Sequence, residues 1–122
     1  MNRRVVAVVD DMFFAAKIRG TAEHLGVKVE FPKNPDALFQ NEAEELPSLI
    51  ICDLHSARHD PFALAERLKT DDKLGAVPLV GFFSHVQTEL LSRGKKAGFD
   101  HVLPRSAFTK QLAGILQGNF SP

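Results

Sequence analysis

The sequence predicts an α/β domain in which a five-stranded parallel sheet is covered by five helices on both faces. Short apolar runs recur along the chain, and the run Ser48–Asp53 is almost continuous, which is typical of a strand buried on both faces. Segments with helical spacing separate these runs, and such alternation produces a doubly wound parallel sheet through right-handed crossovers. Two of the runs, Val5–Val9 and Ser48–Asp53, lead into aspartates at one edge of that sheet.

The chain length predicts one domain over residues 1–122, because a chain of this length can bury a core without disulfides or a structural metal. Fifteen basic and fifteen acidic side chains balance, so neither nucleic acid nor an anionic membrane is an expected partner. The single cysteine, Cys52, excludes an internal disulfide and a cysteine metal cage. No apolar run approaches the length of a membrane span, and we expect a cytoplasmic protein.

The first half of the chain predicts three strands and two helices. The strands are Val5–Val9, Val27–Phe31 and Ser48–Asp53. A helix over Met12–Leu25 ends at Gly26, a residue that commonly caps helix C-termini, and an acidic helix over Asp36–Glu45 follows Pro35. The residues expected to face the core from the first helix are Phe13, Ala16, Ile18, Ala22 and Leu25.

The second half predicts two further strands, Leu79–Phe83 and His101–Leu103, and three helices. The first of these helices has Asp60 as its cap and Pro61 in its first turn, with Phe62, Leu64, Ala65 and Leu68 facing inward. The next covers Val86–Ala97 and ends at Gly98, with Leu90, Leu91 and Ala97 inward. The last is capped by Ser106 and packs through Phe108, Leu112, Ile115 and Leu116.

The acidic residues at the strand ends point to a specific chemistry. Three carboxylates, from Asp10, Asp11 and Asp53, would repel one another unless a cation neutralised them. Mg²⁺ prefers such oxygen ligands, and an aspartate beside the ion can attack a phosphoryl group to form an acyl phosphate. The alternative is that Asp10 only caps the first helix and Asp53 only ends a strand. Arg105 could also bend into this pocket as an internal counter-ion.

The acidic strand ends, together with Val102-Leu103-Pro104-Arg105 near the C-terminus, resemble a two-component response-regulator receiver domain over essentially the whole chain. The resemblance implies a flavodoxin-like strand order 2-1-3-4-5. It also implies that Asp53 is the phosphoacceptor and that Mg²⁺ is bound by Asp10, Asp11, Asp53 and the main chain of His55.

Several residues depart from the pattern of that family. The hydroxyl residue expected after the fourth strand is Ser84 on one alignment, whereas the most natural spacing puts Phe83 there. Arg105 stands where the family has lysine; it keeps the charge and can bind phosphate in a bidentate manner, but the two residues are not interchangeable. Val102 stands where the family commonly has a switch tyrosine or phenylalanine.

The resemblance leaves two functions open. In the first, a histidine kinase or phosphotransfer protein phosphorylates Asp53, and the only catalysis is Mg²⁺-dependent self-phosphorylation and dephosphorylation. In the second, a degenerate receiver binds a target protein, or a second copy of itself, without phosphate. The resemblance places the expected contact face at roughly Val86–Leu116. A dinucleotide site is not expected, because Asp10 and Asp11 replace the glycine-rich turn that would hold a pyrophosphate.

Overall fold

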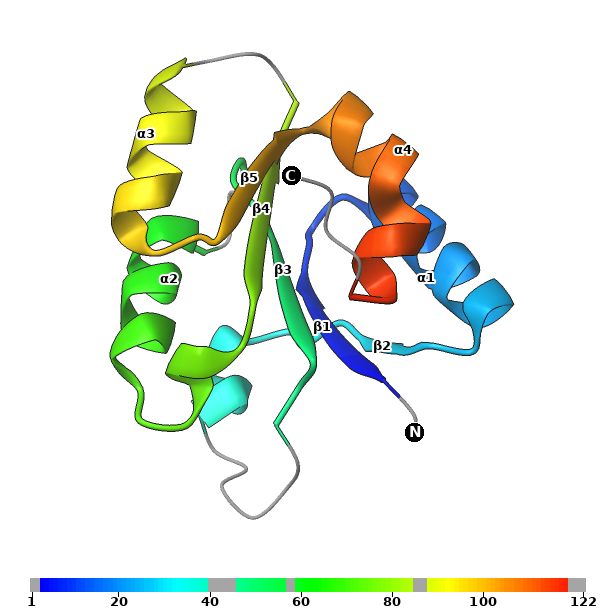
Figure 1. Ribbon diagram of the computed structural model, residues 1–122, viewed down its shortest axis with the longest axis horizontal. Coiled ribbons are helices and arrows are strands. Elements are labelled where there is room, and N and C mark those ends of the chain that lie inside the picture. The colour runs from blue at the N-terminus through cyan, green and yellow to red at the C-terminus, as the bar shows by residue number, and fades with distance from the viewer. Residues whose placement is uncertain (1–2, 40–45, 57–58, 85–87, 119–122) are drawn as a thin grey trace.

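The protein is built around a five-stranded, fully parallel sheet. The computed structural model describes residues 3–39, 46–56, 59–84 and 88–118. The strand order is β2-β1-β3-β4-β5, as the family resemblance implied. The strands β1, β3, β4 and β5 run upward in Figure 1, so their carboxyl ends lie toward its top. The strands are β1 (Arg4–Val8), β2 (Lys28–Glu30), β3 (Leu49–Asp53), β4 (Leu79–Phe83) and β5 (His101–Pro104).

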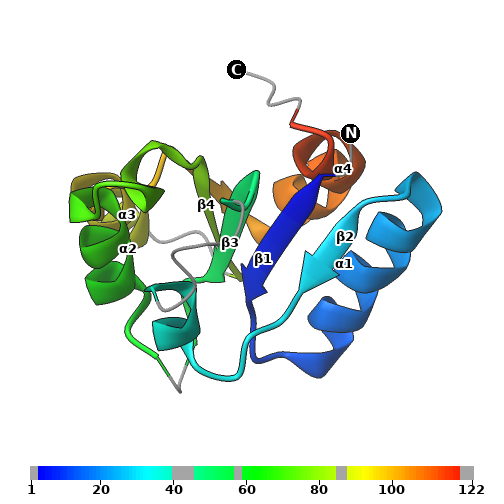
Figure 2. The same cartoon turned by 90° about the horizontal axis from the view of Figure 1, so that it is seen from below.

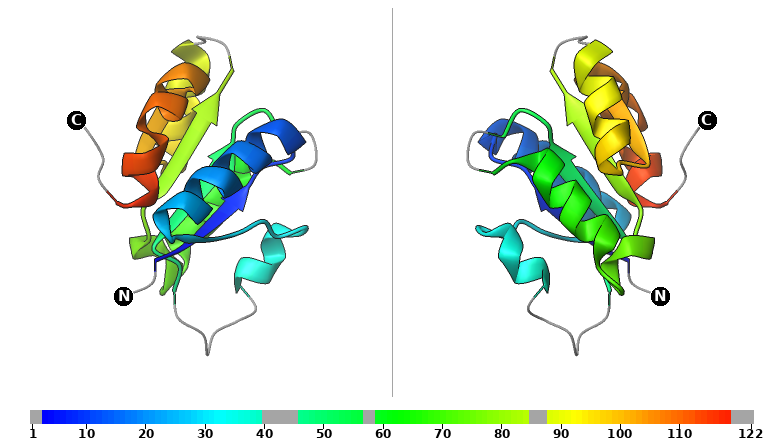
Figure 3. Two further views of the ribbon diagram at one scale, coloured as in Figure 1. Left: turned by 90° about the vertical axis from the view of Figure 1, so that its right-hand side faces the viewer. Right: turned by 90° about the vertical axis from the view of Figure 1, so that its left-hand side faces the viewer.

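Four α-helices cover the two faces of the sheet in pairs. Viewed from below, α1 and α4 lie on one side of the strands and α2 and α3 on the other (Figure 2). Figure 3 shows each pair face on, with the two helices side by side. The helices are α1 (Met12–Leu25), α2 (Pro61–Thr70), α3 (Thr88–Ala97) and α4 (Arg105–Leu116), and two 3₁₀ helices, η1 (Pro35–Phe39) and η2 (Leu74–Ala76), complete the described elements.

The predicted count of five α-helices is wrong for the described part of the chain, because η1 takes the place of the start of the helix expected over Asp36–Glu45. Asn34 closes this region into tight turns: its side-chain oxygen accepts from the Asp36 amide at 3.0 Å and its carbonyl accepts from the Ala37 amide at 3.0 Å. Bonds of this short span favour a 3₁₀ turn over an α-helix. Residues 40–45 of the expected helix lie outside the described residues.

The core consists of two apolar layers, one on each face of the sheet. Successive residues of β1 and β3 alternate between the layers, and all five residues of β3 and of β4 are buried. The β1 and β3 registers match, with Val8 opposite Cys52. This two-sided burial explains why these strands are continuous apolar runs rather than alternating patterns.

The predicted inward face of α1 is confirmed for Ile18 and Ala22, which are buried, and for Leu25, which packs against the core. It is wrong at the start of the helix: Phe13 is 91% exposed and Ala16 is also exposed, and Phe14 is buried instead, at four-residue spacing from Ile18. Spacing of four residues keeps side chains on one face of a helix. The predicted cap of this helix is confirmed: Gly26 has φ 72°, which is the left-handed conformation that favours glycine.

The remaining helix ends agree with the sequence in two cases and disagree in one. Asp60 caps α2 by accepting from the Phe62 and Ala63 amides at 3.0 and 3.1 Å, and Pro61 is its first residue. Gly98 follows α3 with φ 115°. Ser106 is not the cap of α4, because the helix begins one residue earlier at Arg105 and Pro104 occupies the cap position without a side-chain bond.

Candidate functional site

A polar cavity of about 510 Å³ lies at the carboxyl edge of the sheet, where the segments after β1, β3, β4 and β5 converge. Parallel strands bring all their C-terminal ends to this one edge. Every side chain proposed for the site from sequence therefore reaches the same cavity. Its lining residues are Asp10, Asp11, Asp53, His55, Ser56, Phe82, Ser84 and Arg105.

Asp53 is the last residue of β3 and is 7% exposed, the one buried acid among the described residues. Its Oδ1 accepts a hydrogen bond from the His55 amide at 2.8 Å. Burial raises the pKa of the Asp53 carboxyl, and the bond from His55 and the positive charge of Arg105 oppose that rise only in part. The Asp53 carboxylate is therefore more basic than an exposed aspartate.

Asp11 is held by two donors. It is the N-cap of α1, where its Oδ1 accepts from the Phe14 amide at 3.1 Å, and its Oδ2 accepts from Nη2 of Arg105 at 2.9 Å. The Phe14 amide first, and Arg105 second, lower the pKa of this carboxyl. From the sequence, Asp10 was the possible cap of this helix, but Asp11 has this role in the structure.

Arg105 crosses from the start of α4 to the start of α1. Its Cζ lies 4.6 Å from the centre of the Phe14 ring, a distance typical of a cation–π contact. Its Nε is buried and has no hydrogen-bond partner among the described residues. A buried donor without a partner is uncommon in a folded protein, and it marks the position as suited to an additional acceptor such as an oxyanion.

Asp10 is engaged by a residue that sequence analysis did not single out. The Ser56 hydroxyl donates to Oδ2 of Asp10 at 2.6 Å, and the same hydroxyl oxygen accepts from the His59 amide at 3.3 Å. The Ser56 amide also donates to the Asp53 carbonyl at 3.2 Å, so a turn after β3 directs this serine into the pocket. A serine three residues after a strand end is a weak signal, which is why the sequence did not identify it.

The structure distinguishes the two residues that the sequence left open after β4. Phe83 is 1% exposed and packs in the apolar layer beneath α2 and α3. Ser84, the next residue, is exposed and lines the cavity. Of the two residues, Ser84 is thus the one that reaches the pocket, in agreement with the alternation of side chains along a strand.

The carboxylates as placed do not fit a divalent cation. Among the described residues, no three Asp, Glu, His or Cys side chains are grouped so that they could hold a metal ion. The oxygen ligands have the chemistry that Mg²⁺ prefers, but Asp11 is paired with Arg105 and Asp10 accepts from Ser56. Mg²⁺ at Asp10, Asp11, Asp53 and the His55 main chain remains a prediction that requires this arrangement to change.

Comparison with known proteins identifies the fold. No protein-family model and no curated protein matches the sequence. Among solved structures, the chain is similar to the chemotaxis response regulator CheY4 of Vibrio cholerae, with 19% identity and a TM-score of 0.80, over 98% of this chain and 100% of that chain. No helix in the described residues is long and apolar enough to cross a membrane.

Two further solved structures agree with this result. A putative response regulator from Chloroflexus aurantiacus is 18% identical, with a TM-score of 0.83 over 98% of each chain. The Mn²⁺-bound form of response regulator Rcp1 is 17% identical, with a TM-score of 0.75 over 95% of this chain and 90% of that chain. At these identities the likeness concerns the backbone arrangement, and the chain has the fold of response-regulator receiver domains.

Proposed function

We propose that this protein is a signalling receiver that accepts a phosphoryl group on Asp53 from a histidine kinase or a phosphotransfer protein. One observation carries the proposal: a buried aspartate of raised pKa shares one cavity with Ser84 and with an arginine whose Nε has no partner among the described residues. These groups are a nucleophile and two donors for phosphate oxygens.

The transfer step uses the carboxylate oxygen of Asp53. That oxygen attacks the phosphorus of the donor, the new P–O bond forms an acyl phosphate, and the P–N bond of the phosphohistidine breaks as its imidazole leaves and takes up a proton. The amide of His55 binds Oδ1 of Asp53 at 2.8 Å and orients the carboxylate. Water later attacks the phosphorus of the acyl phosphate, which releases inorganic phosphate and returns Asp53 to its free carboxylate.

Arg105 and Ser84 supply the electrostatic part of the proposed site. A guanidinium can bind two phosphate oxygens at once, and its charge offsets the charge that gathers on the transferred group. Because Arg105 already lies in the cavity, the proposal assigns this role to its side chain, with the Ser84 hydroxyl as a second donor. No step is assigned to a divalent cation.

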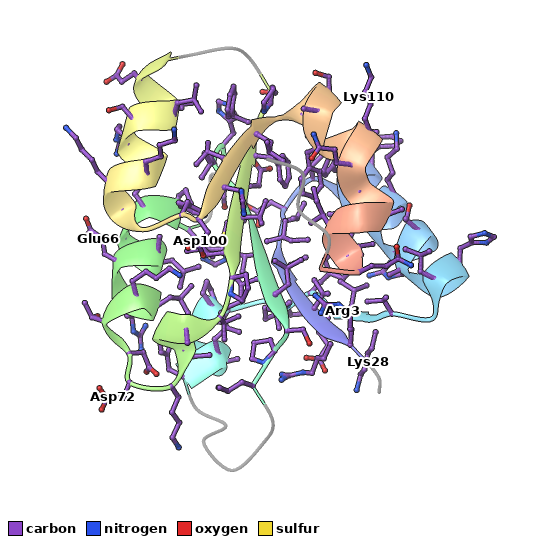
Figure 4. The ribbon with its side chains drawn as sticks, in the orientation of Figure 1. Arg3, Lys28, Glu66, Asp72, Asp100 and Lys110 are labelled. Atoms are coloured by element: carbon purple, nitrogen blue, oxygen red, sulfur yellow. The ribbon has the colours of Figure 1, made fainter. Side chains whose placement is uncertain are left out.

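The proposal is tested with acetyl phosphate and intact-protein mass measurement, once with Mg²⁺ and once with EDTA. We expect one phosphoryl group on the parent and none on Asp53→Asn. Asp72→Asn is a matched control, because Asp72 is exposed on the side of the molecule opposite the carboxyl edge (Figure 4). A parent protein that gains no phosphoryl group in either buffer, or an Asp53→Asn variant that gains one, contradicts the proposal.

A second function, partner binding without phosphate, is favoured by the packing of β5. Val102 is 7% exposed, and a Cβ atom added to Gly94 of α3 would lie 2.8 Å from its Cγ2. Position 102 therefore has no aromatic side chain that could change position on phosphorylation and alter the face formed by α3, β5 and α4. The described part of the expected contact face begins at residue 88, and Val86 lies outside the described residues. Unchanged partner binding by Asp53→Ala would support this second function.

A further inference from the structure

The Arg105 side chain lies in the pocket and is partly buried, with 36% of it exposed. It pairs with Asp11 at 2.9 Å and stacks on Phe14 at 4.6 Å. Phe14 is itself buried against Phe82 and Phe108, with ring centres 4.5 and 5.5 Å away. The guanidinium therefore packs on one side against a buried aromatic cluster.

The backbone explains why these two residues meet. Asp11 caps α1 and Arg105 begins α4, and the two helices pack side by side on one face of the sheet. Their N-termini consequently lie together at the carboxyl edge. A positive side chain at a helix N-terminus opposes the helix dipole, so Arg105 is poorly placed for α4 alone. The carboxylate of Asp11 provides the compensating contact.

We propose that Arg105 is the built-in counter-ion of the acidic pocket and takes the place of a divalent cation at Asp11. The parent protein should then bind Mg²⁺ and Mn²⁺ weakly, and Arg105 should determine how weakly. This inference concerns cation binding in the absence of any phosphodonor. Its test therefore gives an answer whether or not Asp53 is phosphorylated.

The physical basis is direct competition for one carboxylate. A divalent ion would have to displace the guanidinium from Oδ2 of Asp11 and then remain close to a full positive charge. Arg105 also lines the same cavity as Asp10 and Asp53. A divalent ion that approached these two carboxylates would therefore still lie near the positive guanidinium.

The first test is the affinity for Mn²⁺, measured from the free-ion spin-resonance signal for the parent and for Arg105→Gln. We expect Arg105→Gln to bind Mn²⁺ about tenfold tighter or more, since it removes a full charge beside the ion. Arg67→Gln is a matched control outside the pocket: the Arg67 guanidinium pairs with Asp36 at 2.5 Å and stacks on Phe39 at 3.7 Å. Its Mn²⁺ affinity should equal that of the parent.

A second variant keeps the inference testable if Arg105→Gln does not fold. Arg105→Met keeps an apolar stem beside the Phe14 ring and also removes the charge that pairs with Asp11, so it should show the same gain in Mn²⁺ affinity. Arg105→Lys keeps the positive charge and should bind Mn²⁺ about as weakly as the parent. Folded Arg105→Gln and Arg105→Met variants that gain no affinity overturn the inference, as does an Arg105→Lys variant that gains as much as either of them.

Discussion

Asp11 and Asp53 line the same cavity, yet their surroundings shift their pKa values in opposite directions. The Phe14 amide and Arg105 stabilise the charged form of Asp11, whereas burial destabilises the charged form of Asp53. The first carboxylate is therefore a fixed anion that orders the helix ends. The second is the more basic carboxylate, and opposite shifts of this kind are common where two acids share a site.

The raised pKa of Asp53 makes a prediction about stability and pH. Because the folded state binds this proton more tightly than the unfolded chain, the ionised carboxylate destabilises the fold at neutral pH. That cost shrinks as the pH falls through the native pKa and is gone below the unfolded pKa. Asp53→Asn should melt a few degrees higher than the parent near pH 7, as about 1 kcal/mol would produce in a domain of this size. The difference should shrink toward about pH 4, close to the pKa of an unfolded aspartate.

The measurement is a series of thermal melts in EDTA at several pH values, with Asp72→Asn as the control for the loss of one negative charge. An Asp53→Asn variant that is less stable than the parent near neutral pH would show that the ionised carboxylate contributes a net favourable contact. The bond from the His55 amide is the contact that would then be responsible.

At the scale of single elements, α1 shows what the sequence could not decide. Met12, Phe13 and Phe14 are three consecutive apolar residues, so the spacing allows more than one inward face. The choice of Phe14 follows from the aromatic contacts with Phe82 and Phe108, which come from β4 and α4 and leave no local trace in the sequence. Phe13 is left almost fully exposed at 91%.

This difference predicts opposite effects for neighbouring substitutions. Phe14→Ala should lower the free energy of unfolding by about 3–5 kcal/mol, because it leaves a cavity in the aromatic cluster and removes the ring on which Arg105 stacks. Phe13→Ala should change stability by no more than about 0.5 kcal/mol, as is usual for an exposed position. Urea unfolding of both variants measures the two values, and similar losses would mean that the assigned face of α1 is wrong.

A second element-scale prediction concerns the connection between α2 and the strands β4 and β5. Nζ of Lys69 lies 3.0 Å from Oδ2 of Asp100 and also donates to the Gly75 and Val77 carbonyls, at 3.4 and 3.3 Å. The same Asp100 oxygen accepts from the Leu79 amide at 2.8 Å. One ammonium therefore serves three acceptors around the entry to β4.

Lys69→Met should keep the length of the stem but leave these acceptors without their donor, and we expect a loss of about 1–3 kcal/mol. Lys110→Met is the control, because Lys110 is exposed on α4 and points away from the molecule (Figure 4). The free energy of unfolding from urea titration decides the outcome. Equal stability of the two variants would show that the Lys69 contacts contribute little to the free energy of unfolding, as is usual for surface ion pairs.

The site was predictable to the extent that strand ends were predictable. Buried apolar runs have clear limits in the sequence. The first polar residues after the apolar runs of β1, β3 and β4 are Asp10, Asp53 and Ser84, and all three line the pocket. The pairing of Asp11 with Arg105 spans 94 positions of sequence and depends on how α1 packs against α4. Sequence analysis considered that contact as a possibility, but only the packing of the helices could establish it.

At the scale of the whole molecule, the pocket adjoins elements that belong to the expected partner face. Arg105 lies at the junction of β5 and α4, and Ser84 immediately follows β4. Val102 of β5 is buried beneath Gly94 of α3. A valine here has no large ring that could move between a buried and an exposed position, and long-range coupling in proteins generally requires an element with two discrete arrangements.

We therefore predict that phosphorylation of Asp53 produces a local response. In hydrogen exchange with and without acetyl phosphate, peptides from the start of α1, from the turn after β3 and from the start of α4 should become more protected, because Arg105 and Ser84 would bind the new phosphate. Peptides from α3 should not change. Asp53→Asn, treated in the same way, corrects for effects of the reagent itself. Altered exchange in α3 of the parent alone would show that the pocket is coupled to this face by a route other than an aromatic side chain at position 102, and the partner-binding face would then be under phosphoryl control.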